Sequence, residues 1–278
     1  MRKEEKSIYA ATWDRYVTEG FSQIQDRPPH RARDLYSWQV LNTTDDTYTW
    51  PGDEWGDADD VSRILDTCLM PHLPADTGQF CEIASGAGRF TDLLLRRYPE
   101  ARFTCFDISR AFLDQMQARF PQQIAAERMR LSQLTERPEH MYQVLDAAGL
   151  VRKLDCVFSF DAMVHVELHT VLIYLATAAA VLKPDGLLTM NVADATNPHG
   201  FQKLIFNAPG VFRQGGQAGM HFQFMSADIL NMLLTRLGFS AELHDCNGRD
   251  LFFSARLTDP DAAQRAFRSG GSRWWFHE

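Results

Sequence analysis

A short apolar strand that leads through a turn of small residues into a helix is the feature that most constrains this chain. Gln79 to Ile83 are mostly apolar, Ala84 to Gly88 form the turn, and Phe90 begins the apolar face of the helix. Glycine at positions 86 and 88 permits backbone conformations and close approaches that other residues resist. The free N–H groups at the start of the helix can then face a negative group of a ligand. This unit is typical of α/β proteins that bind a ligand at one edge of a sheet.

The middle of the chain repeats the alternation of strand and helix. The further strands that we expect cover 102–106, 129–132, 154–160 and 187–192, with helices over 57–69, 109–116 and 167–182. Strands that alternate with helices predict a parallel sheet covered on both faces. A last helix over 226–237 precedes two strands, 239–246 and 250–257, and Asn247-Gly248 between them predicts an antiparallel hairpin.

Three less regular segments frame this α/β domain, which we place at 56–258. Residues 1–55 hold four of the six tryptophans and are predicted to form an aromatic N-terminal cap, either as a wall of a substrate pocket or as a packing appendage. Residues 195–225 contain five glycines, which predicts a loop-rich insertion that resembles a lid. Residues 259–278 are expected to form a peripheral tail.

The charge balance and the distribution of apolar residues exclude several classes of partner. Acidic residues outnumber basic ones by 36 to 28, a net charge of −8, which argues against binding to nucleic acid or to an anionic membrane. The most apolar stretch, 171–182, is too short for a bilayer that needs about 20 residues. Residues 1–6 are charged and no apolar run follows them, so we expect no secretory signal and a soluble, cytoplasmic protein.

Cysteine usage agrees with a reducing compartment. The chain has five cysteines, an odd number, and no C-x-x-C pair. Neither a disulfide framework nor a zinc site is therefore indicated. We expect buried, reduced thiols.

An acidic residue at the end of the second strand suggests the kind of ligand. Asp107 lies 19 positions after Gly88 (107 minus 88). In nucleoside-binding α/β folds, an acid at about this separation accepts hydrogen bonds from the ribose hydroxyls. The glycine turn and Asp107 together predict a nucleoside-type ligand.

The motif Glu82-Ile83-Ala84-Ser85-Gly86-Ala87-Gly88 resembles the E-x-G-x-G-x-G motif of class I S-adenosylmethionine-dependent methyltransferases, with Ala84 in place of the first glycine. The resemblance extends over about 57–257, through Asp107, the turn at 182–186 and the terminal hairpin. It implies a Rossmann-like fold, with a mostly parallel seven-stranded sheet, an antiparallel C-terminal hairpin and helices on both faces.

The resemblance also implies a cofactor and the residues that bind it. The methyl donor would be S-adenosylmethionine and the product S-adenosylhomocysteine. N–H groups around Ser85 would meet the methionine carboxylate, Asp107 would bind the ribose and Ile108 would contact the adenine. Gln133 stands near the position where relatives usually place an acid against the adenine edge. The residues expected to bind the cofactor are Glu82, Ala84, Ser85, Gly86, Gly88, Asp107, Ile108, Gln133 and Phe160.

The stretch after the fourth strand is expected to supply a general base. Phe158 to His165 resembles the F-S-x-D-x-x-x-H stretch of methyltransferases that act on small metabolites and on sugar or polyketide hydroxyls. His165 has a suitable ordinary pKa of about 6.5 for this role, or it could simply form a hydrogen bond at the start of the next helix. Asp161 could orient His165, touch the substrate or cap that helix. His221 could contact the substrate from a lid or lie at the surface.

Other aromatic and histidine side chains are candidates for the acceptor side. Trp50 and Trp55 are expected to close over the cofactor, where aromatic faces attract its sulfonium charge, or to form the core of the cap. His169 and Phe222 complete the expected acceptor side. His165 and His169 would share a face of one helix, but two ligands from one helix are not a metal site, so no metal is predicted.

The function that we expect is transfer of a methyl group to a small-molecule hydroxyl, as in natural-product biosynthesis. Three alternatives stay open: N- or C-methylation of a small molecule, a catalytically silent partner protein that binds the cofactor, and a nicotinamide-dependent oxidoreductase. A homodimer is possible. The acceptor depends on the cap and the insertion, which are the least regular parts of the chain.

Overall fold

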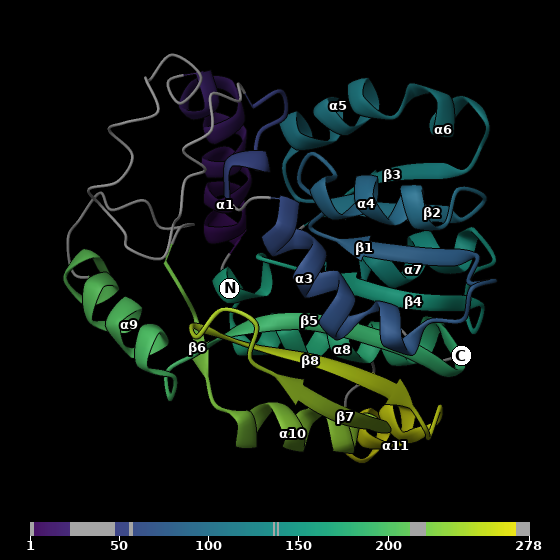
Figure 1. Cartoon of the computed structure of the whole chain (residues 1–278). Coiled ribbons are helices and arrows are strands. Elements are labelled where there is room, and N and C mark those ends of the chain that lie inside the picture. The colour runs from purple at the N-terminus through teal and green to yellow at the C-terminus, as the bar shows by residue number, and fades with distance from the viewer. Residues whose placement is uncertain are drawn as a thin grey trace.

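A mainly parallel sheet forms the centre of the computed structural model, which describes residues 3–22, 48–55, 58–135, 137, 139–211 and 221–270 (Figure 1). The strand order is β3-β2-β1-β4-β5-β8-β7, and β6 pairs with β5 beside this path. The strands are β1 (Gln79–Ile83), β2 (Arg102–Asp107), β3 (Met129–Gln133), β4 (Leu154–Ser159), β5 (Leu182–Asp194), β6 (Phe224–Met225), β7 (Phe239–His244) and β8 (Asp250–Leu257). β8 runs antiparallel to both β5 and β7. The predicted Rossmann-like sheet with an antiparallel end is confirmed, and the short β6 is an addition to it.

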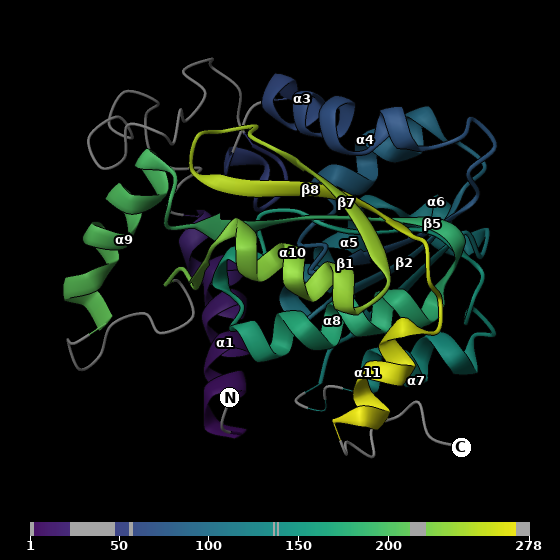
Figure 2. The ribbon, with the colours of Figure 1, turned by 90° about the horizontal axis from the view of Figure 1, so that it is seen from below.

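Helices cover both faces of this sheet, as Figure 2 shows for α3 and α4 on one side and α8, α10 and α11 on the other. The helices whose side chains pack with the first group are α3 (Ala58–Cys68), α4 (Arg89–Arg97), α5 (Arg110–Arg119) and α6 (Pro121–Ala125). The opposite face carries α7 (His140–Ala147), α8 (Leu168–Val181), α10 (Ala227–Arg236) and α11 (Ala262–Ser269). The chain therefore has one core on each side of the sheet.

The strands form because their side chains are apolar on both faces. In β4, Val157 enters the core beneath α8, while Cys156 and Phe158 enter the core beneath α3 and α4. All three are completely buried. Burial of each large apolar side chain contributes about 1.5 to 3 kcal/mol, which explains why a run without polar interruptions becomes an inner strand.

The N-terminal helix lies beyond the carboxyl ends of the parallel strands, on the same side as α9 (Figure 1). α1 spans Lys3–Arg15 and continues as a π-helical turn, Tyr16–Gly20. Asp14 anchors this segment, because its Oδ1 accepts hydrogen bonds from Ser109 Oγ at 2.6 Å and from the Ala111 N–H at 3.0 Å. Asp14 and Ser109 together therefore cap the N-terminus of α5. A 3-10 turn over Asp53–Trp55 completes the described part of the predicted cap, and residues 23–47 lie outside it.

The prediction of a loop-rich insertion is wrong for the first half of residues 195–225. α9 occupies Pro198–Val211. Gly200 lies inside this helix. The position requires glycine, because a Cβ there would come within 1.8 Å of the Asp194 carbonyl oxygen. Glycine at this position allows a helix to pack tightly against β5, a role that composition does not distinguish from that of a loop residue. Residues 212–220 lie outside the described part of the chain.

The terminal hairpin exists, but its connection is longer than an Asn-Gly turn. β7 ends at His244 and β8 begins at Asp250, so residues 245–249 connect them. Asn247 organises this loop, since its Oδ1 accepts hydrogen bonds from the N–H groups of Arg249 and Asp250. Cys246 in the same loop places its Sγ 3.5 Å from Cys68 Sγ of α3. The other three cysteines are buried, and all five are free thiols.

α8 ends at Val181, one residue earlier than predicted, and β5 already begins at Leu182, so the predicted turn at Lys183–Gly186 lies within the strand. Leu182 pairs with Leu154, whereas Leu187 pairs with Cys156, so the residues between them form an irregularity in the ladder. The helix thus passes directly into the strand. At the other end of the chain, the predicted tail contains α11, whose Ala263 is buried, and residues 271–278 lie outside the described part.

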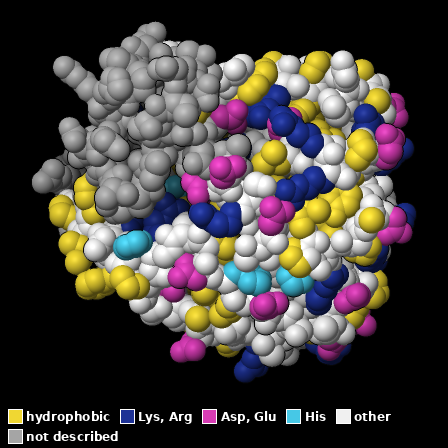
Figure 3. All heavy atoms as spheres, in the orientation of Figure 1, with side chains coloured by type: hydrophobic (Ala, Val, Ile, Leu, Met, Phe, Trp, Pro, Cys, Tyr) yellow, Lys and Arg dark blue, Asp and Glu magenta, His cyan; other side chains and the backbone are white. Residues whose placement is uncertain are grey.

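The surface in Figure 3 shows acidic and basic side chains interspersed over the described part of this face. None of the helices that the structure describes is long and apolar enough to cross a membrane.

Candidate active site

The turn between β1 and α4 adopts the left-handed backbone that its small residues permit. Ala84, Gly86 and Gly88 have φ values of 57°, 55° and 81°. Gly88 is required sterically, because a Cβ there would lie 2.4 Å from Phe120 Cε2. Ala84 adopts the same region although it carries a Cβ. α4 then begins without a side-chain cap, so the first N–H groups of the helix can receive a ligand.

Asp107 closes the other side of this turn. Its Oδ2 accepts a hydrogen bond from the Gly86 N–H at 2.8 Å, and its Oδ1 accepts one from the Ser109 N–H at 2.8 Å. Burial raises the pKa of Asp107 to about 6, against the opposing effect of these N–H groups. The carboxylate is therefore held rigidly at the end of β2, with lone pairs left over for hydroxyl donors.

Glu82 lies beneath the turn and is only 2% exposed. The Thr91 hydroxyl of α4 donates a hydrogen bond to Glu82 Oε2. Burial raises the pKa of Glu82 to about 8, and the nearby charge of Asp107 raises it further. At neutral pH this acid carries a proton, and it ties β1 to α4.

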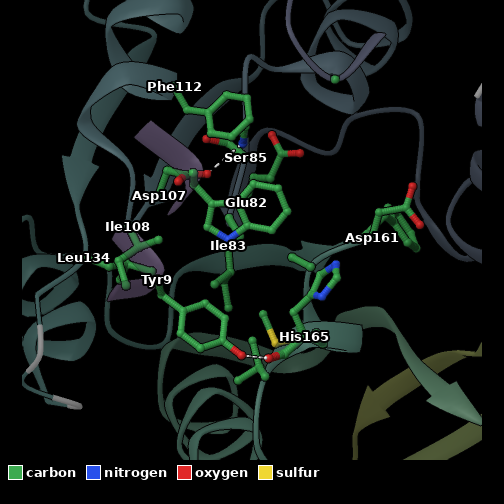
Figure 4. A pocket seen from close by; sticks show the side chains of 18 of the residues that line it. Tyr9, Glu82, Ile83, Ser85, Asp107, Ile108, Phe112, Leu134, Asp161 and His165 are labelled. Carbon is green, nitrogen blue, oxygen red and sulfur yellow. Dashed lines mark hydrogen bonds between the residues drawn. The ribbon is translucent and has the colours of Figure 1, made fainter. Parts of the chain in front are cut away.

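A cavity that is partly open to solvent extends from the turn past the ends of β2 and β4 (Figure 4). Tyr9 and Trp13 of α1 form one wall, and Trp55 and Phe112 stand near them. The ring centroids of Trp13 and Trp55 are 5.9 Å apart, and Phe112 lies 6.4 Å from Trp13 and 6.2 Å from Trp55. An apolar, electron-rich wall of this kind suits a cation such as a sulfonium group.

His165 lies at the far end of this cavity, in a 3-10 turn over Met163–His165. The ring is packed between Trp13 and Phe222, with centroid distances of 5.5 and 4.9 Å. Nδ1 is 3.3 Å from the carbonyl oxygen of His221. A carbonyl only accepts, so this contact places the proton on Nδ1 and the free lone pair on Nε2.

Neighbouring side chains also fix the backbone of this turn and set the charge of the His165 imidazole. The Tyr9 hydroxyl of α1 donates a hydrogen bond to the His165 carbonyl oxygen at 2.6 Å (Figure 4). Burial lowers the pKa of His165 to about 4, and the nearby cations of Arg249 and Lys203 lower it further. The imidazole is therefore neutral at pH 7.

Asp161 faces arginine side chains. Its carboxylate forms ion pairs with Arg89 at 2.7 Å and with Arg249 at 3.6 Å. Its N–H donates a hydrogen bond to Asn191 Oδ1 at 2.8 Å. Among the described residues no hydrogen bond joins it to His165, so it influences the imidazole through its charge alone.

The structure gathers most of the predicted site residues around one cavity. Those that line it are Glu82, Ala84, Ser85, Gly86, Asp107, Ile108, Phe160, Asp161, His165 and Trp55. His221 and Phe222 touch His165 from behind. Trp50 instead packs beside Ala87 and Val17, with Arg119 over its ring at 5.7 Å.

Three predicted residues are placed differently. Gln133 donates from its side chain to the Ile108 carbonyl oxygen at 3.1 Å, and Leu134 and Thr135 line the cavity there instead. Gly88 is not among the described residues that line the cavity, and its lack of a Cβ leaves room for the Phe120 ring. His165 and His169 do not share a helix, because the 3-10 turn ends at His165 and α8 begins at Leu168, so the expectation of a common face is wrong.

Sequence reasoning missed the part that α1 plays in the wall. Tyr9 and Trp13 are four residues apart, a spacing that puts both on one face of α1, but nothing in the sequence tells where that face docks. Arg89 was also missed. Its Nη1 is buried and has no hydrogen-bond partner in the described part of the chain.

The order of the strands and the turn that holds an acid beside a glycine define a class I methyltransferase fold. Residues 81–188 match the family model of a methyltransferase domain. This part of the chain is therefore similar to methyltransferase domains. No curated protein sequence matches the chain.

Solved structures show the same fold at low sequence identity. An O-methyltransferase family protein from Burkholderia thailandensis is 15% identical, with a TM-score of 0.53 over 72% of this chain and 55% of that one. Magnesium protoporphyrin IX methyltransferase from Synechocystis is 15% identical, with a TM-score of 0.51 over 71% and 82%. Geranyl diphosphate C-methyltransferase from Streptomyces coelicolor is 10% identical, with a TM-score of 0.53 over 72% and 79%.

The chain spans little more than half the length of the Burkholderia protein. The names of these proteins include both O- and C-methyltransferases, so the shared fold leaves the acceptor open.

Proposed function

We propose that this protein transfers the methyl group of S-adenosylmethionine to a hydroxyl group of a small molecule, with His165 as general base. The observation that carries the proposal is one cavity with two ends: a glycine turn with a buried carboxylate at one end and a neutral histidine at the other.

The residues of the first end fit the cofactor. The first N–H groups of α4, which follow this turn and have no side-chain cap, suit the methionine carboxylate, and Asp107 has the geometry to accept hydrogen bonds from the ribose. Ile108 and Leu134 offer an apolar slot for the adenine. The cofactor supplies an electrophilic methyl group, and the protein's task is to align a nucleophile with it.

The second end fits the removal of a proton. Nε2 of His165 carries the lone pair when Nδ1–H donates to the His221 carbonyl oxygen. The imidazole is neutral above a pH of about 4, so it can accept the hydroxyl proton as the new O–C bond forms. A pKa this low makes it a weak base, which suits an acidic hydroxyl such as a phenol better than an alkyl alcohol.

The cofactor assignment is tested by calorimetric titration with S-adenosylmethionine, S-adenosylhomocysteine and NADH. We expect binding of the first two and none of NADH. Asp107→Asn should weaken S-adenosylhomocysteine binding at least tenfold, because a charged acceptor for the ribose is lost. Asp114→Asn is the matched control, since Asp114 is exposed on α5 and pairs with Arg110. Binding by Asp107→Asn as tight as that of the control would contradict the assignment.

The base is tested by turnover, measured as release of S-adenosylhomocysteine across a panel of phenols and amines. With a phenolic acceptor, His165→Gln should lower kcat by about 10²- to 10⁴-fold while cofactor affinity stays unchanged. An amine acceptor needs less help with its proton. A variant that keeps most of its turnover would therefore favour N-methylation, and no turnover with any acceptor would favour a silent cofactor-binding protein.

A further inference from the structure

Away from the cavity, two histidines and a glutamate converge at the surface near the edge of the sheet. His72 ends the 3-10 turn Met70–His72 that follows α3, and Glu242 and His244 lie on β7. One potential ligand atom from each of the three lies within 4.8 Å of the other two. The convergence joins parts of the chain that are 170 residues apart (242 minus 72).

The fold explains why these side chains meet. β7 is the last strand in the described part of the sheet, so no described strand pairs with one of its edges. Residues two apart on a strand share a face, which places Glu242 and His244 side by side. The alternate residues Ala241 and Leu243 pack into the core beneath α8 and α10. Histidine and acidic side chains are visible on the face in Figure 3.

A hydrogen bond from beneath holds one of the rings. His244 Nε2 is 2.9 Å from Ser254 Oγ of β8, and the Ser254 hydroxyl donates to the Cys68 carbonyl oxygen. Because that hydroxyl has a single proton, Nε2–H of His244 must be the donor to Ser254. The ring is thus held in one orientation and one tautomer, with its free lone pair on Nδ1. Such a hydrogen bond from behind is typical of histidines that bind metals.

We propose that His72, Glu242 and His244 form a binding site for a zinc-like divalent cation that clamps the edge strand to the segment after α3. Two imidazoles and a carboxylate are a donor set that Zn²⁺ accepts, with water in the fourth position. Ligand atoms about 2.0 to 2.1 Å from a tetrahedral ion stand about 3.3 Å apart. The three ligand atoms must therefore approach one another by up to about 1.5 Å, and because Ser254 holds the His244 ring, rotation of the His72 and Glu242 side chains must provide this approach.

The local charges set the strength of the site. The Arg256 guanidinium donates to the His72 carbonyl oxygen, so a cation already stands nearby. Glu242 is the only carboxylate of the three and offsets that charge. Micromolar affinity is therefore the expectation, tighter than scattered surface histidines provide and weaker than a closed structural site.

The test uses the full chain without a histidine tag. Calorimetric titration with ZnCl₂ should give one site per chain, and Co²⁺ should give the visible absorption bands of a tetrahedral complex. His244→Ala and Glu242→Gln should each weaken Zn²⁺ binding at least tenfold. His199→Ala is the matched control, because His199 is an exposed histidine on α9. Zn²⁺ should also raise the unfolding temperature of the wild type and of the control only.

Two outcomes would overturn the proposal. One is Zn²⁺ affinity that is equal in Glu242→Gln, His244→Ala and His199→Ala, or no binding at all. The other is loss of binding in Cys246→Ser with no loss in His244→Ala, because the thiols of Cys68 and Cys246 would then be the ligands. Glu242→Gln changes only an exposed side chain, so misfolding does not confuse the comparison.

Discussion

At the scale of single residues, Ala84 shows how this chain tolerates a departure from the glycine motif. Its φ of 57° lies in the left-handed region, which costs a residue with a Cβ about 1 to 2 kcal/mol. The neighbouring Gly86 and Gly88 share that conformation, so the turn keeps its shape and the strain stays local.

Substitutions at Ala84 should therefore follow backbone strain. We expect Ala84→Gly to be at least as stable as the wild type, because relief of strain offsets the greater freedom of the unfolded chain. Ala84→Val should lose at least about 1 kcal/mol, since β-branched residues resist positive φ. Urea unfolding without cofactor measures both. Ala118→Val is the control, because Ala118 is an exposed residue of α5. An equal loss of stability in this control would show that valine itself, and not the positive φ at position 84, is responsible.

At the scale of elements, the docking of α1 depends on a carboxylate at the start of α5. Asp14 accepts hydrogen bonds from Ser109 Oγ and the Ala111 N–H, where the helix dipole favours a negative charge. Asp14→Ala should weaken this docking by about 1 to 2 kcal/mol. Trypsin should then cleave after Arg15 faster than in the control Glu19→Ala. Unchanged cleavage would mean that the aromatic contacts hold α1 without Asp14.

The elements also show which inferences a sequence supports. The strands β1, β2 and β4 and the helix that begins near Ser109 were predictable, because apolar runs express local preferences. α9 was not, because Gly200 serves a close contact with β5 rather than a loop. The Asn-Gly pair in the hairpin likewise belongs to a longer loop, organised by the Asn247 side chain.

The same limit applies to the candidate site. Asp107 and His165 were identifiable because each follows a predicted strand, and parallel strands end at one edge. Tyr9, Trp13 and Arg89 join them only through tertiary docking. Gln133 was expected in the cavity by analogy of position, but its amide bonds to the Ile108 backbone instead.

At the scale of the whole molecule, buried acids make stability depend on pH. Burial raises the pKa of Glu54 to about 7 from its ordinary 4.5, and its Oε1 has no hydrogen-bond partner among the described residues. The folded state then binds more protons than the unfolded state between those pH values. Stability therefore falls as pH rises from about 4.5 to 7, by at most about 3 kcal/mol from this residue. Asp107 and Glu82 act in the same direction.

His165 acts in the opposite direction. Its pKa is lowered to about 4, so the unfolded state binds the extra proton and stability falls as pH decreases from 6.5 to 4. We expect Glu54→Gln to be more stable than the wild type at pH 8 by about 2 kcal/mol, with a much smaller difference at pH 5. Urea unfolding at both pH values measures this. Glu100→Gln, which removes the charge of an exposed acid, is the control. If Glu54→Gln gained the same stability at pH 5 as at pH 8, this explanation would be wrong.

The helix α1, which forms one wall of the cavity, is held in place by two hydrogen-bonded contacts. Tyr9 donates a hydrogen bond to the His165 carbonyl oxygen, and Asp14 accepts one from Ser109 at the start of α5. These two contacts fix α1 at opposite ends of the cavity. S-adenosylhomocysteine that leaves past this wall can do so only when both hydrogen-bonded contacts have opened. We therefore expect a variant in which either contact is removed to release S-adenosylhomocysteine faster than the wild type.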